Sequence, residues 1–443
     1  MAIEEQTVTM DKVVALAKRR GFVFGSNEIY GGLSGFWDYG PLGVELKQNI
    51  KRTWWRSIVH MRDNVVGLDA SIIAPPAVFA ASGHLQNFND PLVECEKCKR
   101  RFRADDIDSD VCPACGGHLT APRQFNTMFQ THVGPVADDA SVAYLRPETA
   151  QGTFVNFKNV MQTTSRRLPF GIAQIGKSFR NEITTGNFIF RSREFEQMEL
   201  EFFVKPGTDD EWFDYWRDER MRWWTEDLGI NRENLRIRDH EKSELSHYSK
   251  QTSDIEYAFP FGWKELEGVA DRTDFDLKAH QVGSGEDMTY FDDETQQRYV
   301  PFVIEPAAGV DRTFLVALLD AYAEEQTGPK PSDRRTVLKL KPTLAPYKVG
   351  VFPLLANKPQ LVEKARDIYN TLLPGFTVAW DDIGNVGKRY RRQDEIGTPW
   401  CVTVDFQTLE DNTVTVRDRD TMTQERVDVE RLAALFRERL GPM

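Results

Sequence analysis

The fold is decided by the stretch RNEITTGNFIFRSREFEQMELEFF, residues 180–203. Side chains of an extended chain point to opposite faces in turn, and Met198, Leu200 and Phe202 alternate here with polar or aromatic residues. The preceding residues 172–182 split into two faces in the same way, and residues 184–187 have turn chemistry. The stretch therefore predicts two antiparallel strands, with one face in the core and one polar face.

Arginine guanidinium groups, a carboxylate and phenylalanine rings cluster on this polar face. Arg180 and Glu182 leave the first strand, and Phe190, Arg191 and Phe195 enter the second, with Arg193 between them. An arginine fork suits phosphate and its plane stacks on a purine, so the pattern favours a bound nucleotide. The alternative is a solvated hairpin with exposed ion pairs, but such pairs contribute only about 0–1 kcal/mol and need no ordered face.

Length and composition set the class of protein. A chain of 443 residues predicts two or three domains, and 40% hydrophobic and 28% charged residues are ordinary globular values. The N-terminus is acidic and there is no uncharged apolar run of about 18 residues, so we expect a cytoplasmic protein that does not enter the membrane. The net charge of -12 argues against a protein that coats nucleic acid nonspecifically, although it permits a local basic groove.

Four of the five cysteines form two knuckles. Cys95 and Cys98 are followed by Cys112 and Cys115, and two Cys-x2-Cys pairs place four thiolates at tetrahedral distance. This spacing favours a structural Zn²⁺ in a closed, noncatalytic site, within a zinc-ribbon insertion at about residues 92–120. Reduced surface thiols or two short disulfides are the alternatives. Cys401, in the apolar WCVTVDF, is expected in the core.

A helix is predicted near the start of the chain. Pro41 suits its beginning, and apolar residues recur at helical spacing from Leu46 to Met61. The adjacent Trp54 and Trp55 cannot both enter one core from a helix, so one of them is expected in a subunit interface. A helix packed between two layers of the same chain is the alternative.

Two domains follow from the periodicity. Strands connected through turns and insertions, without a βαβ rhythm, predict an α+β domain over residues 1–341 with a large antiparallel sheet flanked by helices. From residue 342 to 443, strands and helices alternate, which predicts a compact α/β domain with a mostly parallel sheet.

Acidic residues recur in three further motifs. Glu148 lies in RPETAQG; Glu265, Glu267 and Arg272 lie in WKELEGVADR; and Glu305 begins EPAAGVDR, which ends at Arg312. Glu265 and Glu267 are plausible carboxylates for Mg²⁺. Glu148, Glu199 and Glu305 on internal elements need a cation to compensate them, and a small amine would serve.

These residues resemble the signature motifs of class II aminoacyl-tRNA synthetases. The helix with SIIAPPAVF is similar to their dimer-forming first motif, the hairpin to the second, and residues 309–312 to the third. RPETAQG, FRNEI, REFEQMELEFF, EGVADR and VIEPAAGVDR, in this order, resemble glycyl-tRNA synthetases of the homodimeric type. Residues 342–443 resemble the anticodon-binding domain of that family.

The resemblance implies a site for ATP with Mg²⁺. Arg180 would hold the α-phosphate and the amino acid carboxylate, Glu182 the adenine amino group, and Phe195 would stack on the base. Arg180, Arg312 and Glu265 are the catalytic residues expected. The full set implied for ATP is Arg180, Asn181, Glu182, Phe190, Arg191, Ser192, Arg193, Glu194, Phe195, Glu265, Leu266, Gly309, Val310, Asp311 and Arg312.

The resemblance also implies a glycine site in which Glu148, Glu199 and Glu305 surround the ammonium. The full set is Arg103, Glu148, Phe195, Glu196, Gln197, Met198, Glu199, Arg272, Glu305, Pro306, Ala307, Ala308 and Gly309. Family members commonly carry serine where this chain has Ala307. A tight acid-lined pocket would exclude larger amino acids by a clash with Cβ, so no editing domain is expected.

A glycine tRNA and a homodimer are the partners that the resemblance implies. The run GKRYRRQDE suits phosphates and a stacked base through Lys388, Arg389, Tyr390, Arg391 and Arg392; a solvated basic face is the alternative. A noncatalytic paralogue would lack Arg180, Glu265 or Arg312, a zinc-ribbon regulator would leave most of the chain unexplained, and a sister synthetase for proline or serine is disfavoured by the acids. The expected reaction is ligation of glycine to tRNA through glycyl adenylate.

Overall fold

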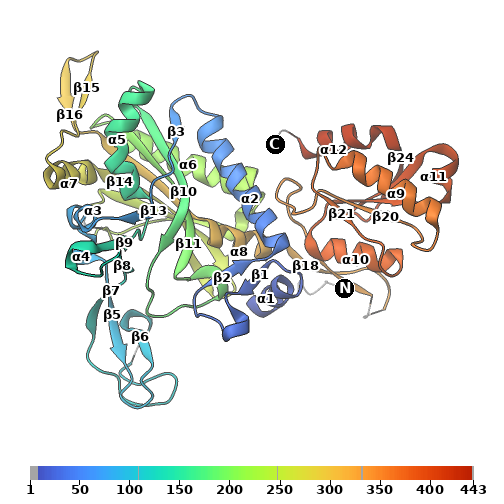
Figure 1. Cartoon of the computed structure of the whole chain (residues 1–443), viewed down its shortest axis with the longest axis horizontal. Helices are drawn as coiled ribbons and strands as arrows, with labels where there is room; N and C mark the ends of the chain where they lie inside the picture. Colours follow the sequence, from blue (N-terminus) through green and yellow to red (C-terminus); the bar gives the residue numbers. More distant parts are fainter. Residues whose placement is uncertain (1–7, 108, 247, 331–332, 442–443) are drawn as a thin grey trace.

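The computed structural model of the chain describes residues 8–107, 109–246, 248–330 and 333–441. A larger N-terminal body holds a central sheet, and a smaller body formed by the last hundred or so residues packs beside it (Figure 1). Among the described residues, no helix is both long and apolar enough to cross a membrane.

A seven-stranded sheet forms the centre of the N-terminal body. In spatial order its strands are β12 (Leu235–Asp239), β13 (Gln251–Phe259), β14 (Gly262–Thr273), β17 (Phe302–Gly309), β11 (Glu194–Val204), β10 (Phe170–Phe179) and β3 (Val65–Gly67). All neighbours are antiparallel except β10 and β3. The predicted antiparallel sheet is confirmed.

The two faces of this sheet carry different helices. Met198, Leu200 and Phe202 join one core cluster with α2 (Pro41–Trp55), α6 (Asp209–Arg222) and α8 (Val310–Ala321). We call this the helix face. Phe170 and Phe203 pack on the other face against α5 (Ala150–Thr164) and α7 (Phe275–Ser284). We call that the site face, because the acidic residues lie there.

The two adjacent tryptophans at the end of α2 differ in burial. Trp54 is fully buried in the core, whereas Trp55 is partly exposed and lies beside β3. A Cβ atom on Gly67 would meet the Trp55 ring at 2.5 Å, so Gly67 makes room for that ring. A one-turn extension, η2 (Arg56–His60), continues the helix.

The connection between β10 and β11 is longer than predicted. Residues 184–187 do not form a tight hairpin turn; the strands end at Phe179 and restart at Glu194, and η5 (Phe188–Phe190) lies between them. Only the pairs of Arg180 with Arg193 and Gly186 with Arg191 continue the ladder. The charged residues of this segment therefore lie on a long loop, which can wrap around a ligand.

Small elements surround the sheet. The insertion forms a three-stranded sheet of β5 (Asn89–Glu94), β6 (Arg101–Arg103) and β7 (Arg123–Asn126), which projects from one end of the body (Figure 1). The remaining elements before it are α1 (Met10–Arg19), β1 (Val23–Gly25), η1 (Glu28–Tyr30), β2 (Trp37–Tyr39), β4 (Ile73–Ala74), α3 (Pro76–Ala81) and α4 (His84–Asn87). Those after its first strands are η3 (Ala104–Asp106), β8 (Gln130–His132), η4 (Asp139–Ser141), β9 (Val142–Leu145), η6 (Trp223–Asp227), η7 (Arg232–Asn234), β15 (Tyr290–Asp292), β16 (Gln297–Tyr299), β18 (Tyr322–Gln326) and β19 (Arg334–Leu338).

The C-terminal body has its own core and a mixed sheet. Its elements are β20 (Val349–Pro353), α9 (Pro359–Leu372), β21 (Val378–Trp380), α10 (Val386–Ile396), β22 (Trp400–Val404), α11 (Phe406–Asp411), β23 (Thr413–Asp418), β24 (Gln424–Asp428), η8 (Val429–Arg431) and α12 (Leu432–Leu440). β20 pairs in parallel with β21 and β22, but β22, β23 and β24 are antiparallel. The prediction of a mostly parallel sheet is wrong there, because the connections after β22 and after β23, residues 405–412 and 419–423, are too short for a parallel crossover.

Polar contacts join the two bodies. Arg335 of β19 forms a buried ion pair with Asp394 of α10 at 3.1 Å, and Arg20 pairs with Glu395 at 2.6 Å. Asn49 of α2 donates to the carbonyls of Leu344 and Ala345, both at 3.1 Å.

Candidate active site

Three glutamates, the buried Glu199 and Glu305 and the partly buried Glu148, converge on the site face of the sheet. Glu199 of β11 stands opposite Ala307 of β17, and Glu305 lies two residues further along the same face of β17. Glu148 precedes α5, which packs on this face. The main-chain N–H of Thr149 donates to Glu199 Oε2 at 2.9 Å, so the chain next to Glu148 is fastened to the sheet. The predicted acid trio is thus brought together.

Arg272 supplies the positive charge beneath the acids. Its Nη1 donates to Glu305 Oε2 at 2.8 Å, and its Nε and Nη2 donate to Asp276 at 2.7 and 2.9 Å. Gln151 links Glu148 to Arg272 and its partners, since its Nε2 donates to Asp276 Oδ1 and to Glu148 Oε1, both at 3.1 Å. A continuous hydrogen-bonded network therefore joins Glu148 to Glu305.

The acids have very different pKa values. Burial raises the pKa of Glu305 to about 8, with Arg272 opposing the shift. The pKa of Glu199 is raised by burial and by the charge of Glu148. Burial also acts against ionisation of Glu148, but His84 and Arg272 hold the pKa of this carboxyl well below its usual range. The pocket thus has one firmly ionised acid and others that need a bound cation to ionise fully.

Arg180 lies between two rings at the edge of this pocket. Its guanidinium is 5.2 Å from the centre of the Phe88 ring and 5.4 Å from that of Phe195, and its Nε donates to Pro147 O at 3.0 Å. The rings and the carbonyl fix the fork beside Glu148, the residue that follows Pro147. An anion held by Arg180 would therefore lie next to a cation held by the acids.

Three other predicted ATP residues meet at the start of α8. The Arg312 guanidinium stacks 4.4 Å from the Phe190 ring centre, and its Nη1 donates to Glu265 O at 3.0 Å. Glu265 Oε2 is 3.3 Å from the same Nη1. Residues 190, 265 and 312, distant in the sequence, thus form one partly exposed group, and Gly309 is the N-cap residue of the helix that carries Arg312.

The insertion reaches the loop between β10 and β11. Asp106 Oδ2 accepts from Arg191 Nη1 at 3.1 Å, and Arg103 pairs with Asp90 at 3.3 Å and with Asp105 at 3.1 Å. Burial raises the pKa of Glu182, and the charges of Arg180, Arg191 and Arg103 oppose it. Arg103 thus lies near Glu182, with its guanidinium group paired to two aspartates, and its predicted contact with glycine stays a prediction.

Several residues predicted for glycine lie on the wrong face. Glu196, Met198, Pro306 and Ala308 alternate with the site residues and are on the helix face, where Glu196 pairs with Lys47 at 2.7 Å. Their side chains cannot line the acid pocket, because neighbouring residues in a strand point to opposite sides. Phe195, Gln197 and Ala307 share the face of Glu199, and Gln197 Nε2 donates to Glu199 Oε1 at 2.5 Å.

A similar correction applies to residues predicted for ATP and Mg²⁺. Val310, Leu266 and Asp311 are buried, and Asp311 accepts from Tyr39 Oη, from Lys47 Nζ and from the N–H of Glu196. Glu267 is fully buried on the helix face, bound by Arg220 at 2.5 Å and by Trp224 Nε1 at 2.6 Å. These carboxylates stabilise the interior and are not available to a metal–nucleotide.

The other predicted loop residues support the loop itself. Arg193 donates to Glu182 O and Ser34 O, Glu194 pairs with Lys177 at 2.6 Å, and the N–H of Asn181 donates to Thr127 O. Ser192 is buried. The side chains of Arg193 and Glu194 therefore contact protein groups, not the exposed group around Arg312.

The predicted tRNA run forms α10, and it is mostly engaged within the protein. Arg389 is only 1% exposed and donates to the carbonyls of Pro353, Asp382 and Gly384, so its assignment to RNA is wrong. Arg392 is held by Asp381 at 2.7 Å, Arg391 donates to Thr327 at 3.0 Å, and Tyr390 is hydrogen-bonded to Thr403 at 2.6 Å. Lys388 is exposed.

The four knuckle cysteines form one cluster. Their sulfur atoms all lie within 4.8 Å of one another, with Cys95 Sγ 3.5 Å from Cys115 Sγ and Cys98 Sγ 3.7 Å from Cys112 Sγ. A tetrahedral Zn²⁺ with ~2.3 Å bonds needs sulfurs about 3.8 Å apart. The backbone N–H of Cys98 lowers the pKa of the Cys95 thiol to about 6, whereas burial and the neighbouring thiols raise the pKa of Cys98 to about 11. The donor set fits zinc.

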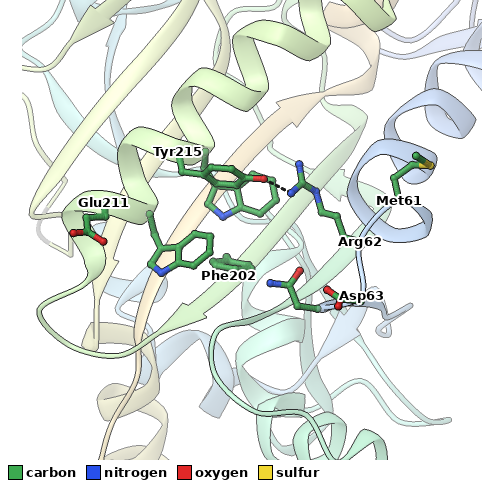
Figure 2. Close-up of a pocket in the computed structure, with 9 residues that line it drawn as sticks. Met61, Arg62, Asp63, Phe202, Glu211 and Tyr215 are labelled. Carbon is green, nitrogen blue, oxygen red and sulfur yellow. Dashed lines mark hydrogen bonds between the residues drawn. The ribbon is translucent and has the colours of Figure 1, made fainter.

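Two cavities lie away from the acids, on the helix face. One of about 650 Å³ is bounded by Phe202, Trp212 and Arg62, and Figure 2 shows the Arg62 fork pointing at the hydroxyl of Tyr215. The other, of about 1220 Å³, lies between α2 and the C-terminal body and includes Trp55 and Lys348. Neither contains residues of the acid trio.

Some residues of the site were not predicted from the sequence. His84, Gln151, Asp276 and Thr149 all contact the acids or their partner Arg272. Thr149 and Gln151 adjoin Glu148 in RPETAQG, and Asp276 follows Arg272 at a helical spacing of four, so those patterns contained a usable signal. His84 lies far from the acids in the sequence and offered none.

Comparison with known proteins defines the class. Residues 134–322 match the family model "tRNA synthetase class II core domain (G, H, P, S and T)", and residues 348–439 match "Anticodon binding domain". The glycine–tRNA ligase of Thermobifida fusca is 56% identical over 98% of this chain and 98% of its own. Those of Streptomyces coelicolor, 55% identical over 97% and 98%, and Bifidobacterium longum, 56% over 98% and 93%, are similarly related. The chain belongs to the glycine–tRNA ligase family.

Proposed function

We propose that this protein uses ATP to ligate glycine to the 3′ end of glycine tRNA through glycyl adenylate. The observation that carries the proposal is the convergence of Glu148, Glu199 and Glu305 beside Arg180, in a chain that belongs to the glycine–tRNA ligase family. The acids accept a small ammonium group, and the arginine accepts the carboxylate and phosphate that react.

The acids bind the substrate amine in their charged forms. Glu148 is ionised before glycine arrives, and the ammonium charge favours ionisation of Glu199 and Glu305. Helix α5 packs on this face of the sheet beside the acids. We infer that glycine is selected by exclusion of Cβ and that no editing site is needed, with Ala307 adding no hydroxyl to the contact.

The nucleotide is held on the open side of Arg180. Arg180 binds the α-phosphate, Glu182 and Phe195 bind adenine, and Arg191, Arg312 and Glu265 border the triphosphate and its Mg²⁺. Mg²⁺ would neutralise phosphate charge when bound. The residues orient the glycine carboxylate in line with the α-phosphorus and stabilise the charge that develops as pyrophosphate leaves, so no covalent enzyme intermediate is required. The ribose 3′-hydroxyl of tRNA then attacks the carbonyl carbon of the adenylate; the ester bond forms, the bond to the phosphate breaks, and AMP leaves while the hydroxyl loses its proton.

Zinc, the domain division and the subunit structure are parts of the same proposal. The spacing of the cysteine sulfurs supports a structural Zn²⁺. The separate C-terminal core supports domains of residues 1–341 and 342–443, the second binding the anticodon with Lys388.

Three exposed apolar residues near the end of α2 and beyond it, Met61, Ile72 and Ile73, support a homodimer through the first motif. We place the protein in the cytoplasm. Light scattering would then give twice the 50.9 kDa of one chain.

Amino-acid-dependent exchange of pyrophosphate into ATP tests the activity. Glycine is expected to support exchange, whereas alanine, serine and proline are expected to give no more than background. Aminoacylation of glycine tRNA, but not alanine tRNA, is the second measurement. Exchange with none of the four amino acids would favour a noncatalytic paralogue and would overturn the proposal.

A further inference from the structure

A histidine lies directly behind the ionised acid of the pocket. His84, the first residue of α4, is buried, with its Nε2 3.4 Å from Glu148 Oε1 and its Nδ1 2.8 Å from Ser82 Oγ. Its ring packs against Phe79 and Phe88, with ring centres 6.0 and 5.3 Å away. Asn126 of β7 holds its backbone by donating to His84 O at 3.2 Å. The ring therefore has a fixed orientation.

The protons of this pair can be assigned from its partners. Glu148 is a carboxylate and accepts only, so Nε2 of His84 must carry the hydrogen of the contact. The Ser82 hydroxyl satisfies Nδ1 in either case: it donates to a neutral ring, or accepts from an imidazolium while donating to Phe79 O at 3.4 Å. Both forms present the same donor to Glu148.

The two oxygens of Glu148 have different environments. The His84 contact and the Gln151 contact, at 3.4 and 3.1 Å, both end on Oε1. The protein thus binds one oxygen from two directions, and this fixes the plane of the carboxylate. No contact from the described residues ends on Oε2, which can therefore accept from a ligand beside the acids.

We propose that Ser82 and His84 are positioning residues that turn Glu148 Oε2 toward the glycine ammonium. They act through Glu148 and do not touch glycine or ATP. The inference rests on the proposed function, because it concerns the affinity of that reaction's smaller substrate. It predicts that glycine binding depends on the donor at Nε2, whereas ATP binding does not.

The experiment measures glycine-dependent pyrophosphate exchange with His84→Phe, which keeps a ring between Phe79 and Phe88 but removes the donor. The KM for glycine should rise about 10- to 100-fold, the range for loss of a hydrogen bond to a charged group, while the KM for ATP should change by less than about twofold. His84→Gln should recover most of the loss, because its amide N–H can donate to the same oxygen.

Three further variants keep the result interpretable. Ser82→Ala should raise the glycine KM in the same direction but less, and it tests the pair if His84→Phe does not fold. His84→Phe should cost almost nothing further in a Glu148→Gln background, because both changes remove one interaction. His132→Phe is the matched control, since His132 Nδ1 also meets a serine, Ser141 at 3.0 Å, but on the surface.

Two results would overturn the inference. One is an equal rise in the KM values for glycine and ATP with His84→Phe, and the other is full additivity with Glu148→Gln. An unaltered enzyme that shows no glycine-dependent exchange would instead contradict the proposed function, so the two failures are distinguishable.

Discussion

At the scale of single residues, the buried and partly buried acids of the site face have different protonation states because they have different neighbours. Glu201 lies on the site face one step beyond Glu199; it is fully buried, and burial and Glu305 raise its pKa well above the usual range. Glu148, by contrast, has donors on Oε1 and is ionised. Acids that lack a compensating cation are therefore protonated and neutral, and they ionise when a cation binds.

This arrangement predicts how stability depends on pH. The Glu305 carboxyl has a pKa of about 8 in the folded protein, against about 4.3 in an unfolded chain. The folded state binds the extra proton between these values, so the free energy of unfolding should fall as pH rises through this window. Glu305→Gln should remove up to about 1.4 kcal/mol per pH unit of that slope.

Urea unfolding of the glycine-free protein at a series of pH values measures this slope. Saturating glycine should flatten it, because the bound ammonium favours the ionised acids. Identical slopes for the Glu305→Gln variant and the unaltered protein would show that Glu305 does not hold the proton.

Glu148→Ala tests the assignment of the ammonium site. The variant should raise the KM for glycine at least about 100-fold and that for ATP by less than about threefold, since a charged contact is lost only for the amine. Pyrophosphate exchange at varied concentrations of each substrate gives both values. Equal losses for both substrates would contradict the role of Glu148.

At the scale of elements, helix α10 shows what the sequence could and could not give. Its basic run predicted RNA contacts, yet Arg389, Gln393 and Ile396 recur at helical spacing and all are buried. This period was readable in the sequence. It was not recognised because an arginine is ordinarily exposed, whereas here Arg389 donates to one distant carbonyl, that of Pro353, and to two in the loop before the helix.

Arg389 and Lys388 should therefore behave oppositely when each is changed to alanine. Arg389→Ala leaves three carbonyls without a donor and should lower the free energy of unfolding by about 2–4 kcal/mol. Lys388→Ala should leave stability within about 0.5 kcal/mol and raise the KM for tRNA a few fold. Chemical denaturation and aminoacylation at two salt concentrations distinguish them. A large stability loss with Lys388→Ala, or none with Arg389→Ala, would contradict this division.

Strand β11 was predicted well in its core pattern and less well in its site. The alternation of Met198, Leu200 and Phe202 gave the buried face. The list of consecutive residues for glycine ignored the same alternation, and Glu196 is the clearest error. His84 was beyond reach, because only the three-dimensional packing of α4 brings it to the acids, whereas the spacing of Asp276 from Arg272 was readable in the sequence.

At the scale of the whole molecule, the domain order and the antiparallel sheet followed from the sequence. Local patterns specify strands and helices, and the absence of a βαβ rhythm specified antiparallel pairing in the first domain. In the second domain, helices between the first strands suggested a parallel sheet throughout, but strand direction after β22 depends on short connections that periodicity does not reveal.

The cysteine cluster forms its own small core, separate from that of the sheet. The proposed zinc site predicts that Cys95→Ser with Cys112→Ser abolishes zinc binding and unfolds the insertion, while the main thermal transition shifts by only a few degrees. The loss of the Asp106–Arg191 pair should alter the KM for ATP more than that for glycine. Metal analysis measures the bound zinc, amide hydrogen exchange measures unfolding of the insertion, and pyrophosphate exchange gives the two KM values. Global unfolding on zinc removal would show that the insertion supports the entire fold.

The two-sided use of β11 makes this strand intolerant of small insertions and deletions. Loss of one residue before Glu196 would rotate the rest of the strand by half a period, placing Glu199 among the apolar side chains of the helix face and Met198 among the acids. A one-residue deletion in β11 would therefore impair both substrate binding and folding. Length variation among descendants of this gene should therefore accumulate in the loop of residues 180–193 or in the insertion, and spare the strand.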